Sequence, residues 1–251
     1  MRFIDGRIIL EEYHFERLSY GLDKLGFEKP GSLTKENLRL DIAQECKRKK
    51  ISGNTRVKLS VFLATKNMGS EKMQDQYQVE AWPLDEGDSQ WNKDGLLVHI
   101  FSSAKKKCDQ FSNLKTINRD IYNKAEEFYR QHQLDDCLIL NEHDRICEST
   151  IANIFWIKNE IIYTVPLSEG CVAGVMRRYL MEKLPDSGYE MREREMGIKE
   201  LKEADEVFLT NAIKGVRWIM RCSDSYYSNK TILKIYTDHI EKFLINQKLT
   251  E

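Results

Sequence analysis

Segments with strand character alternate with segments of helical periodicity along almost the whole chain, and this alternation restricts the fold more than any other feature of the sequence. Residues 2–4 and 7–10 flank Asp5-Gly6, a pair favoured in two-residue hairpin turns. Apolar residues then recur at helical spacing over 11–25, and Gly26 is placed to end that helix. The other expected elements are helices at 35–49, 116–132, 174–184 and 231–247, and strands at 55–64, 78–83, 96–102, 136–140, 152–158, 161–165, 189–193, 206–210 and 215–221. The sequence therefore predicts an α/β (α+β) fold.

A polar segment divides these elements into two groups. Residues 103–110, SAKKKCDQ, have the composition of a connection. We therefore expect a small N-terminal α+β domain at 1–102, a linker at 103–110 and a larger C-terminal α/β domain at 111–251. A crevice between two such domains is a common place for a small-molecule site.

Charge balance and cysteine usage exclude several classes of function. Lysine and arginine number 39 against 40 for aspartate and glutamate, so there is no electrostatic case for binding nucleic acid. The six cysteines include no CxxC pair and no Cys/His cluster at zinc spacing, which predicts free thiols in a reducing cytosol and no metal site. The N-terminus is charged and no stretch approaches the roughly 18 apolar residues of a membrane span, so we expect a cytoplasmic protein without a membrane partner.

Lys115 has unusual neighbours for a lysine. Leu114 and Ile117 lie close to it, and no acidic residue follows until Asp120. An ammonium group that is partly desolvated in this way has a lowered pKa and suits a nucleophile or a base. The alternative from this segment alone is a solvated lysine at the start of a helix.

Two places in the second half of the chain are suited to hold an anion. Gly170 and Gly174 bracket the entry to a helix, where backbone N–H groups and the helix dipole favour negative charge. The strand segment 207–212 ends in small polar residues, which suits a second anion contact. Upstream, Glu148 and Asn153 stand where a sheet edge is expected to turn into a hairpin. Each feature alone is commonly structural, because a glycine before a helix usually makes only a turn and a buried glutamate is usually paired.

In their order along the chain, these features resemble the class IV pyridoxal-phosphate aminotransferase family. That family includes 4-amino-4-deoxychorismate lyases, branched-chain aminotransferases and D-amino-acid aminotransferases. The resemblance covers nearly the whole chain and is carried by four segments: Tyr13–Leu18 (H-x-x-R-L), Leu114–Arg119 (the segment of the Schiff-base lysine), Glu148–Trp156 (E-x-x-x-x-N-[IV]-F) and Pro166–Arg177 (T-P…G…G-[IV]-x-R). It implies the two-domain fold type IV of D-amino-acid aminotransferases, pyridoxal 5′-phosphate as the cofactor, and a homodimer.

The resemblance also assigns roles to individual residues. It implies that Lys115 forms the Schiff base with the cofactor and, once released, removes the substrate proton. It implies that Glu148 faces the pyridine nitrogen and keeps it protonated, and that Asn153 in the same motif is a cofactor contact. The phosphate is a dianion and needs several donors. The expected donors are Arg17, the N–H groups of Val175 and Met176, and the Thr210-Asn211 turn.

The segment 210–217, TNAIKGVR, bears on the substrate. It is similar to the N-[AS]-[LI]-x-G-[IV]-R pattern of aminodeoxychorismate lyases, whereas the aminotransferases more often have a G-T-A or T-T-S run. The similarity favours a lyase that eliminates pyruvate from a small-molecule amino substrate and gives 4-aminobenzoate. The glycine- and arginine-rich loop of several lyases is not found, and residues 66–72 (KNMGSEK) stand in its place. An aminotransferase of branched-chain or D-amino acids, and a non-catalytic cofactor-binding relative, therefore stay open as alternatives.

Two arginines are candidates for contacts with the substrate. Arg56 lies in the alternating strand segment TRVKLSVF, which can direct it towards a substrate carboxylate, although many strand arginines are simply solvated. Arg119 follows Lys115 by one helical turn, where it can contact the ligand or form a surface ion pair.

Overall fold

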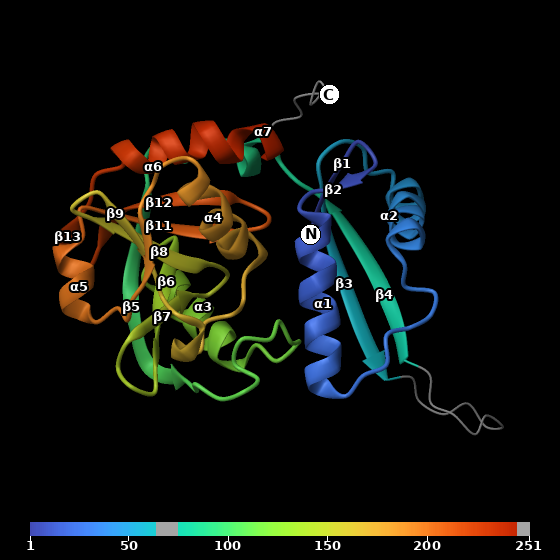
Figure 1. Ribbon diagram of the computed structural model, residues 1–251, viewed down its shortest axis with the longest axis horizontal. Coiled ribbons are helices and arrows are strands. Elements are labelled where there is room, and N and C mark those ends of the chain that lie inside the picture. The colour runs from blue at the N-terminus through green and yellow to red at the C-terminus, as the bar shows by residue number, and fades with distance from the viewer. Residues whose placement is uncertain (64–74, 245–251) are drawn as a thin grey trace. The chain divides into compact units, whose positions relative to one another are not determined.

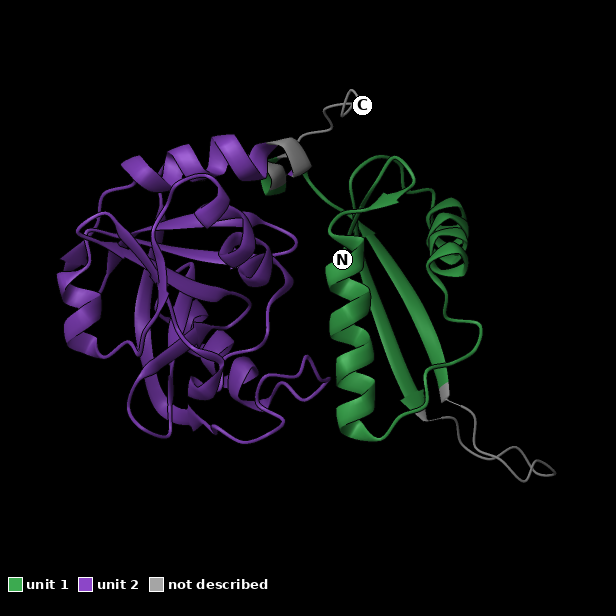
Figure 2. Ribbon diagram, viewed as in Figure 1, with its two compact units in different colours: residues 1–88 green, residues 89–251 purple. Residues whose placement is uncertain are grey.

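The structure, a computed structural model, describes residues 1–63 and 75–244 and divides the chain into two compact units (Figure 2). The first unit is Met1–Asp88 and the second is Ser89–Glu251. Residues 66–72, which stand in place of the expected substrate loop, lie outside the described residues. No helix of the described part of the chain is long and apolar enough to cross a membrane.

The first unit is a four-stranded sheet with two helices. The strand order is β2-β1-β3-β4, and β3 and β4 form a long antiparallel pair. Asp5 and Gly6 both have positive φ in the turn between β1 and β2, as a two-residue hairpin turn of this kind requires. The elements are β1 (Arg2–Ile4), β2 (Arg7–Ile8), α1 (Glu11–Leu25), α2 (Lys35–Lys49), β3 (Thr55–Leu63), β4 (Asp75–Pro83) and the 3-10 turn η1 (Glu86–Ser89). Both helices share one apolar core with the sheet, through Phe15 of α1 and Leu38 of α2.

The second unit is built on a nine-stranded mixed sheet (Figure 1). Its order is β10-β9-β8-β11-β12-β5-β6-β7, and β13 pairs with β12. The strands are β5 (Leu96–Lys106), β6 (Asp136–Asn141), β7 (Ile146–Ser149), β8 (Asn153–Lys158), β9 (Ile161–Thr164), β10 (Met191–Glu193), β11 (Glu206–Asn211), β12 (Gly215–Cys222) and β13 (Ser225–Tyr226). The helices are α3 (Asp120–Gln131), η2 (Leu167–Glu169), α4 (Val175–Asp186), α5 (Ile198–Glu203), α6 (Lys230–Ile235), the π-helical turn η3 (Tyr236–Ile240) and α7 (Glu241–Leu244).

Two apolar cores place the elements of the candidate site. The larger one lies among β6, β7, β8, β11 and β12. The smaller one joins α3 to β5, β6 and β7, with Tyr122 and Ala125 of α3 packed near Cys147 of β7. Because Glu148 follows Cys147 directly, this packing brings α3 next to a buried carboxylate.

The mixed α/β fold is confirmed, and several predicted bounds are confirmed with it. Helices at 11–25 and 35–49 form as expected, and Gly26 ends α1 in the left-handed conformation. The strands predicted at 152–158 and 161–165 form β8 and β9, an antiparallel pair joined by a turn with positive φ at Asn159 and Glu160.

Other elements differ from the predictions. Strand β5 belongs entirely to the sheet of the second unit and continues to Lys106. The two units therefore divide after Asp88, earlier than the predicted 102, and half of the expected linker 103–110 is strand. The polar, lysine-rich end of β5 has the composition of a linker, but it pairs with β6, a contact between distant segments. Helix α3 begins at Asp120, four residues after the predicted start at 116. Strands β7 and β13 and helix α5 were not predicted, and they are among the shortest elements.

Candidate active site

Glu148 lies at the centre of the candidate site, in the short buried strand β7. Its side chain is 4% exposed. Oε1 accepts a hydrogen bond from the Tyr122 hydroxyl at 2.6 Å and forms an ion pair with the Lys106 ammonium. Oε2 accepts a hydrogen bond from the Val172 N–H at 2.9 Å. These partners compensate the carboxylate for the water it loses on burial.

Lys106 is a site residue that the sequence analysis missed. It stands in the middle of a lysine run, 105–107, which has the composition of a polar connection. Because the run continues strand β5, successive side chains point to opposite faces of the sheet. Lys105 pairs with Asp144 at 2.7 Å and is 40% exposed, whereas Lys106 is 10% exposed. The sequence signal for Lys106 was the alternation of side chains between the two faces of a strand, if that strand is continued into the lysine run.

The aromatic ring of Tyr122 gathers three cations of the site. The distances from its centroid are 5.3 Å to Lys106 Nζ, 5.8 Å to Lys115 Nζ and 5.7 Å to Arg119 Cζ. Burial, and after it the negative charge of Glu148, raises the pKa of Tyr122. The phenol therefore stays protonated and donates to the carboxylate, which links the predicted residues Lys115 and Glu148 through one side chain.

Lys115 lies in a loop that other contacts hold in place. The loop is anchored by Asn113, whose side-chain amide donates to the Leu167 carbonyl at 2.8 Å and to the Cys171 carbonyl at 2.7 Å. The carbonyl of Asn113 accepts the Ala173 N–H at 2.9 Å. Lys115 itself is exposed, which agrees with the solvated alternative and not with a desolvated ammonium. Leu114 is buried and Ile117 is 84% exposed, so the apolar pattern around Lys115 does not form a common pocket.

The first of the predicted anion contacts is at the start of helix α4. Gly174 is its N-cap and supplies no side-chain cap, so the N–H groups of the first turn, which include Val175 and Met176, lack acceptors within the helix. A Cβ at Gly174 would meet Asn153 Oδ1 at 1.9 Å, so only glycine fits there. Asn153 also donates from Nδ2 to the Val172 carbonyl at 2.8 Å. Asn153 thus holds the backbone that leads into α4.

The second predicted anion contact is at Thr210. It pairs with Asn153 across strands β11 and β8, and it is 1% exposed. Its Oγ1 is buried and has no hydrogen-bond partner among the described residues. A buried hydroxyl without a partner is costly, and its position next to an uncapped helix N-terminus fits an anion ligand. The neighbouring Asn211 uses its side-chain oxygen within its own turn, where it accepts the N–H groups of Ile213 and Lys214.

Arg17 lies in the first unit, on helix α1. Burial lowers the pKa of Arg17 to about 10. Within residues 1–63 and 75–244 no acidic side chain forms an ion pair with Arg17, so its charge is available to an anion. His14, one turn earlier, is 5% exposed, and burial followed by nearby positive charges lowers its pKa. The contribution of Arg17 to the site in the second unit stays a prediction.

The two arginines nominated for substrate have other contacts in the structure. Arg56 lies on β3 with its guanidinium 5.5 Å from the centroid of the Trp82 ring. Arg119 lies just before α3, near the Tyr122 ring and 3.9 Å from a Glu126 carboxylate oxygen. Arg119 therefore belongs to the group around Glu148, while Arg56 lies in the other unit.

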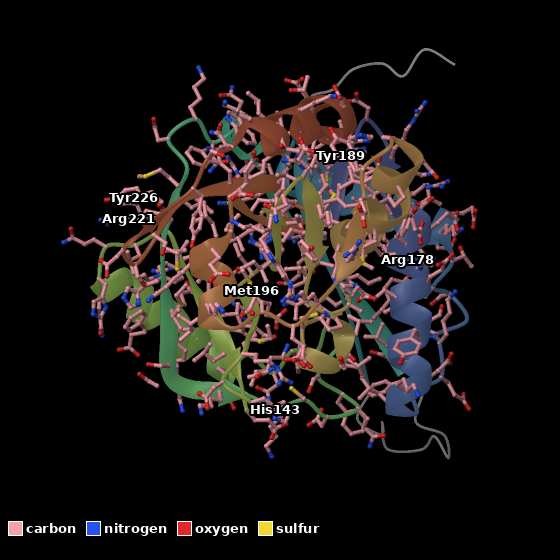
Figure 3. All side chains as sticks on the ribbon, turned by 60° about the vertical axis from the view of Figure 1, so that its left-hand side comes forward. His143, Arg178, Tyr189, Met196, Arg221 and Tyr226 are labelled. Atoms are coloured by element: carbon pink, nitrogen blue, oxygen red, sulfur yellow. The ribbon has the colours of Figure 1, made fainter. Side chains whose placement is uncertain are left out.

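A set of side chains of metal-ligand type was also missed by the sequence analysis, which expected no metal site. Cys108, Glu142 and His143 have ligand atoms within 4.8 Å of one another, and His143 (labelled in Figure 3) lies in the turn between β6 and β7. Glu142 is also engaged in the backbone: Oε1 accepts the Cys108 N–H at 2.7 Å, and its own N–H donates to the Lys106 carbonyl at 2.9 Å. These contacts fasten the turn to the end of β5 and so help to fix Lys106.

A family model described as "Amino-transferase class IV" matches residues 1–222. The chain belongs to the class IV aminotransferase family. The enzymes of this family depend on pyridoxal phosphate.

Two curated relatives of the class IV family are named aminodeoxychorismate lyase. The one from Vibrio harveyi is 35% identical over 99 residues, which are 38% of this chain and 36% of the relative. The one from Bacillus subtilis is 26% identical over 228 residues, or 84% of this chain and 72% of the relative. The chain thus spans about a third of the first relative's length. A branched-chain-amino-acid aminotransferase-like protein 2 from Arabidopsis thaliana is 23% identical over 217 residues, or 85% of this chain and 38% of the relative.

The fold of the family is also found among solved structures. A protein from Legionella pneumophila, provisionally named 4-amino-4-deoxychorismate lyase, has a TM-score of 0.76 at 21% identity and covers 90% of this chain and 83% of its own. The branched-chain amino acid aminotransferase from Escherichia coli has a TM-score of 0.75 at 18% identity, covering 90% of this chain and 76% of its own. At these identities the likeness concerns the fold, which is fold type IV.

The described residues fit the cofactor of this family. A pyridoxal phosphate molecule needs an acidic partner for its ring nitrogen, donors for its phosphate and a lysine for its aldehyde. The second unit supplies a buried carboxylate at Glu148, an uncapped helix start with the unpartnered Thr210 hydroxyl beside it, and two lysines near Tyr122. The unpartnered hydroxyl is the sharpest sign of fit, because a phosphate oxygen would satisfy it.

Proposed function

We propose that this protein is a pyridoxal 5′-phosphate-dependent 4-amino-4-deoxychorismate lyase, which eliminates pyruvate and releases 4-aminobenzoate. The observation that best supports this substrate is the similarity to the Bacillus subtilis relative named aminodeoxychorismate lyase, which aligns with 84% of this chain. The segment 210–217 supports the same choice, because it resembles the pattern of the lyases. A homodimer and a cytoplasmic location are part of the proposal.

Binding of the cofactor is assigned to residues of the second unit and to Arg17. The N–H groups of Val175 and Met176 and the hydroxyl of Thr210 bind the phosphate, and the charge of Arg17 is proposed to add to them. Glu148 accepts a hydrogen bond from the protonated ring nitrogen, and Tyr122 and Val172 hold the Glu148 carboxylate in position. Asn153 shapes the cradle through its contacts with Val172 and Gly174.

Lys115 is assigned the reacting amine. The bound cofactor supplies an electron sink for the carbanion that forms beside the substrate nitrogen. Lys115 carries the cofactor and then accepts the proton from C4 of the substrate, a transfer worth roughly 10²–10⁴-fold in rate. With that proton removed, the C–O bond to the enolpyruvyl group breaks and the substrate ring becomes aromatic. The enolate that leaves takes up a proton and becomes pyruvate. Arg119, near the same tyrosine ring, is available to a substrate carboxylate.

Product analysis tests this proposal. Purified protein loaded with pyridoxal phosphate is given aminodeoxychorismate without any keto acid, and 4-aminobenzoate and pyruvate are measured. We expect equal amounts of the two products, because a lyase returns the cofactor unchanged at each turnover. The lyase proposal fails if products form only when a 2-keto acid is added.

A second candidate is an aminotransferase of branched-chain or D-amino acids. The Arabidopsis relative named as branched-chain aminotransferase-like favours it. An aminotransferase leaves the substrate nitrogen on the cofactor after each half-reaction. Rapid and complete bleaching of the cofactor by leucine, D-alanine or D-glutamate, followed by recovery of colour with the matching keto acid, would identify this activity. We expect only slow bleaching.

A further inference from the structure

The Glu148 carboxylate has one acceptor position left. A carboxylate offers about four lone-pair positions, two on each oxygen. Oε1 uses both of its positions, for the Tyr122 hydroxyl and for the Lys106 ammonium. Oε2 uses one for the Val172 N–H. The remaining position is on Oε2, so a ring nitrogen that donates to Glu148 must bind there.

The charge of Glu148 already has a partner before any ligand arrives. Lys106 contacts the carboxylate directly and is 10% exposed, so water screens this pair little. Lys115 and Arg119 lie near the same tyrosine ring, and Lys106 forms a direct ion pair with the Glu148 carboxylate. Removing one partner of a buried ion pair is strongly destabilising.

We propose that Lys106 is a positioning residue that serves as the resident counter-ion of Glu148. It fixes Oε1, leaves Oε2 for the cofactor, and shares the negative charge of the carboxylate with the ring nitrogen. The sharing of charge with the ring nitrogen rests on the proposed function, in which Glu148 keeps the ring nitrogen protonated.

Sharing the carboxylate changes the proton affinity of the ring nitrogen in a definite direction. Lys106 and a protonated ring nitrogen are both positive, and both bind the same carboxylate. Lys106 therefore weakens the hold of the site on the ring proton, in comparison with an unshared carboxylate. A lysine that served only to support the local structure would act in the opposite direction, because its loss would loosen Glu148 and release the proton more easily.

The lysine run supplies matched controls. Lys105 and Lys107 flank Lys106 in the sequence, and both are exposed. Lys105 binds Asp144 at the surface, an exposed ion pair that contributes little. Lys105→Met and Lys107→Met change the same residue type in the same segment without removing the partner of Glu148.

The first experiment uses the cofactor-free protein and a double-mutant cycle of unfolding. Lys106→Met leaves an unpaired buried carboxylate and Glu148→Gln leaves an unpaired buried ammonium, so each is expected to shift the unfolding equilibrium by roughly 100-fold or more. The double variant leaves neither charge, so its shift is expected to be well below the product of the two. Additive effects would overturn the counter-ion role. If Lys106→Met alone does not fold, a folded double variant supports the proposal and an unfolded one overturns it.

The second experiment measures the ring proton directly. The 15N resonance of ring-labelled pyridoxal phosphate, bound to each variant, is followed against pH. We expect Lys106→Met to bind the ring proton at least tenfold more tightly than wild type, while Lys106→Arg, Lys105→Met and Lys107→Met stay close to wild type. An unchanged or weaker proton affinity in Lys106→Met overturns the shared charge. If the wild-type protein takes up no cofactor, the proposed function fails, and the cofactor-free cycle still decides whether Lys106 is the counter-ion.

Discussion

Replacing Thr210 by valine should have opposite effects on the empty and the loaded protein. The Thr210 hydroxyl is buried, with the residue 1% exposed, and has no partner among the described residues. A buried unsatisfied polar group costs about 1–3 kcal/mol. Valine has nearly the same shape and no hydroxyl. Removing the hydroxyl should therefore stabilise the cofactor-free protein, by about 1 kcal/mol.

With the cofactor bound, the substitution of Thr210 should be unfavourable instead of stabilising. In the proposed site the Thr210 hydroxyl has a charged partner, a phosphate oxygen. A hydrogen bond to a charged group contributes about 1.5–3 kcal/mol, so Thr210→Val should weaken cofactor binding roughly 10- to 100-fold. Stability without the cofactor and affinity for it should therefore change in opposite directions.

Urea unfolding of the cofactor-free protein and a fluorescence titration with pyridoxal phosphate measure the two effects. Thr164→Val is the matched control, because Thr164 is also 1% exposed but its hydroxyl donates to the Ile154 carbonyl at 2.9 Å. The control should lose about 1 kcal/mol of stability and keep its cofactor affinity. If Thr210→Val is destabilised like the control, or binds the cofactor as tightly as wild type, the anion contact at Thr210 is wrong.

Three further substitutions test other parts of the site. Lys115→Ala should remove the near-visible absorption band of the bound cofactor and at least 10²–10⁴-fold of turnover, measured by spectrum and product assay; a variant that keeps both would exclude Lys115. Glu148→Gln should slow proton removal from C4, read from solvent deuterium exchange, far more than it weakens cofactor binding; equal exchange rates would take Glu148 out of the site. Gly174→Ala places a Cβ at 1.9 Å from Asn153 Oδ1, so it should cost about 1–3 kcal/mol of stability and weaken cofactor binding as the cradle shifts, and a neutral result would contradict the close packing.

Local sequence signals predicted the regular elements of the first unit well. Helix α1 has both an apolar periodicity and a terminal Gly26, and the β1–β2 turn has the Asp5-Gly6 pair, so each is specified within a few residues. Strand β7 is only Ile146–Ser149, four residues in a segment of mixed polarity. Its identity as a strand depends on pairing with β6, which no local pattern contains.

In the candidate site too, local motifs could be predicted and contacts between distant segments could not. Lys115, Glu148 and the glycines before α4 could be predicted as candidate site residues because their motifs are contiguous in the sequence. Lys106 was missed because its partner Glu148 is 42 residues away and the ion pair exists only once β5 and β7 flank β6. Of the two alternatives for Lys115, the structure favours the solvated lysine for a related reason: apolar neighbours in sequence, such as Ile117, are exposed to solvent in the folded loop.

The attachment point of the cofactor is the most direct test of whether Lys115 is the reacting amine. Protein loaded with pyridoxal phosphate is treated with borohydride, which reduces the bond between the lysine nitrogen and the cofactor, and the modified peptide is identified by mass spectrometry. We expect one modified residue, Lys115, with Lys106 unmodified because its ammonium is bound to Glu148. Modification at Lys106, or no modified lysine in a protein that has taken up the cofactor, would contradict it.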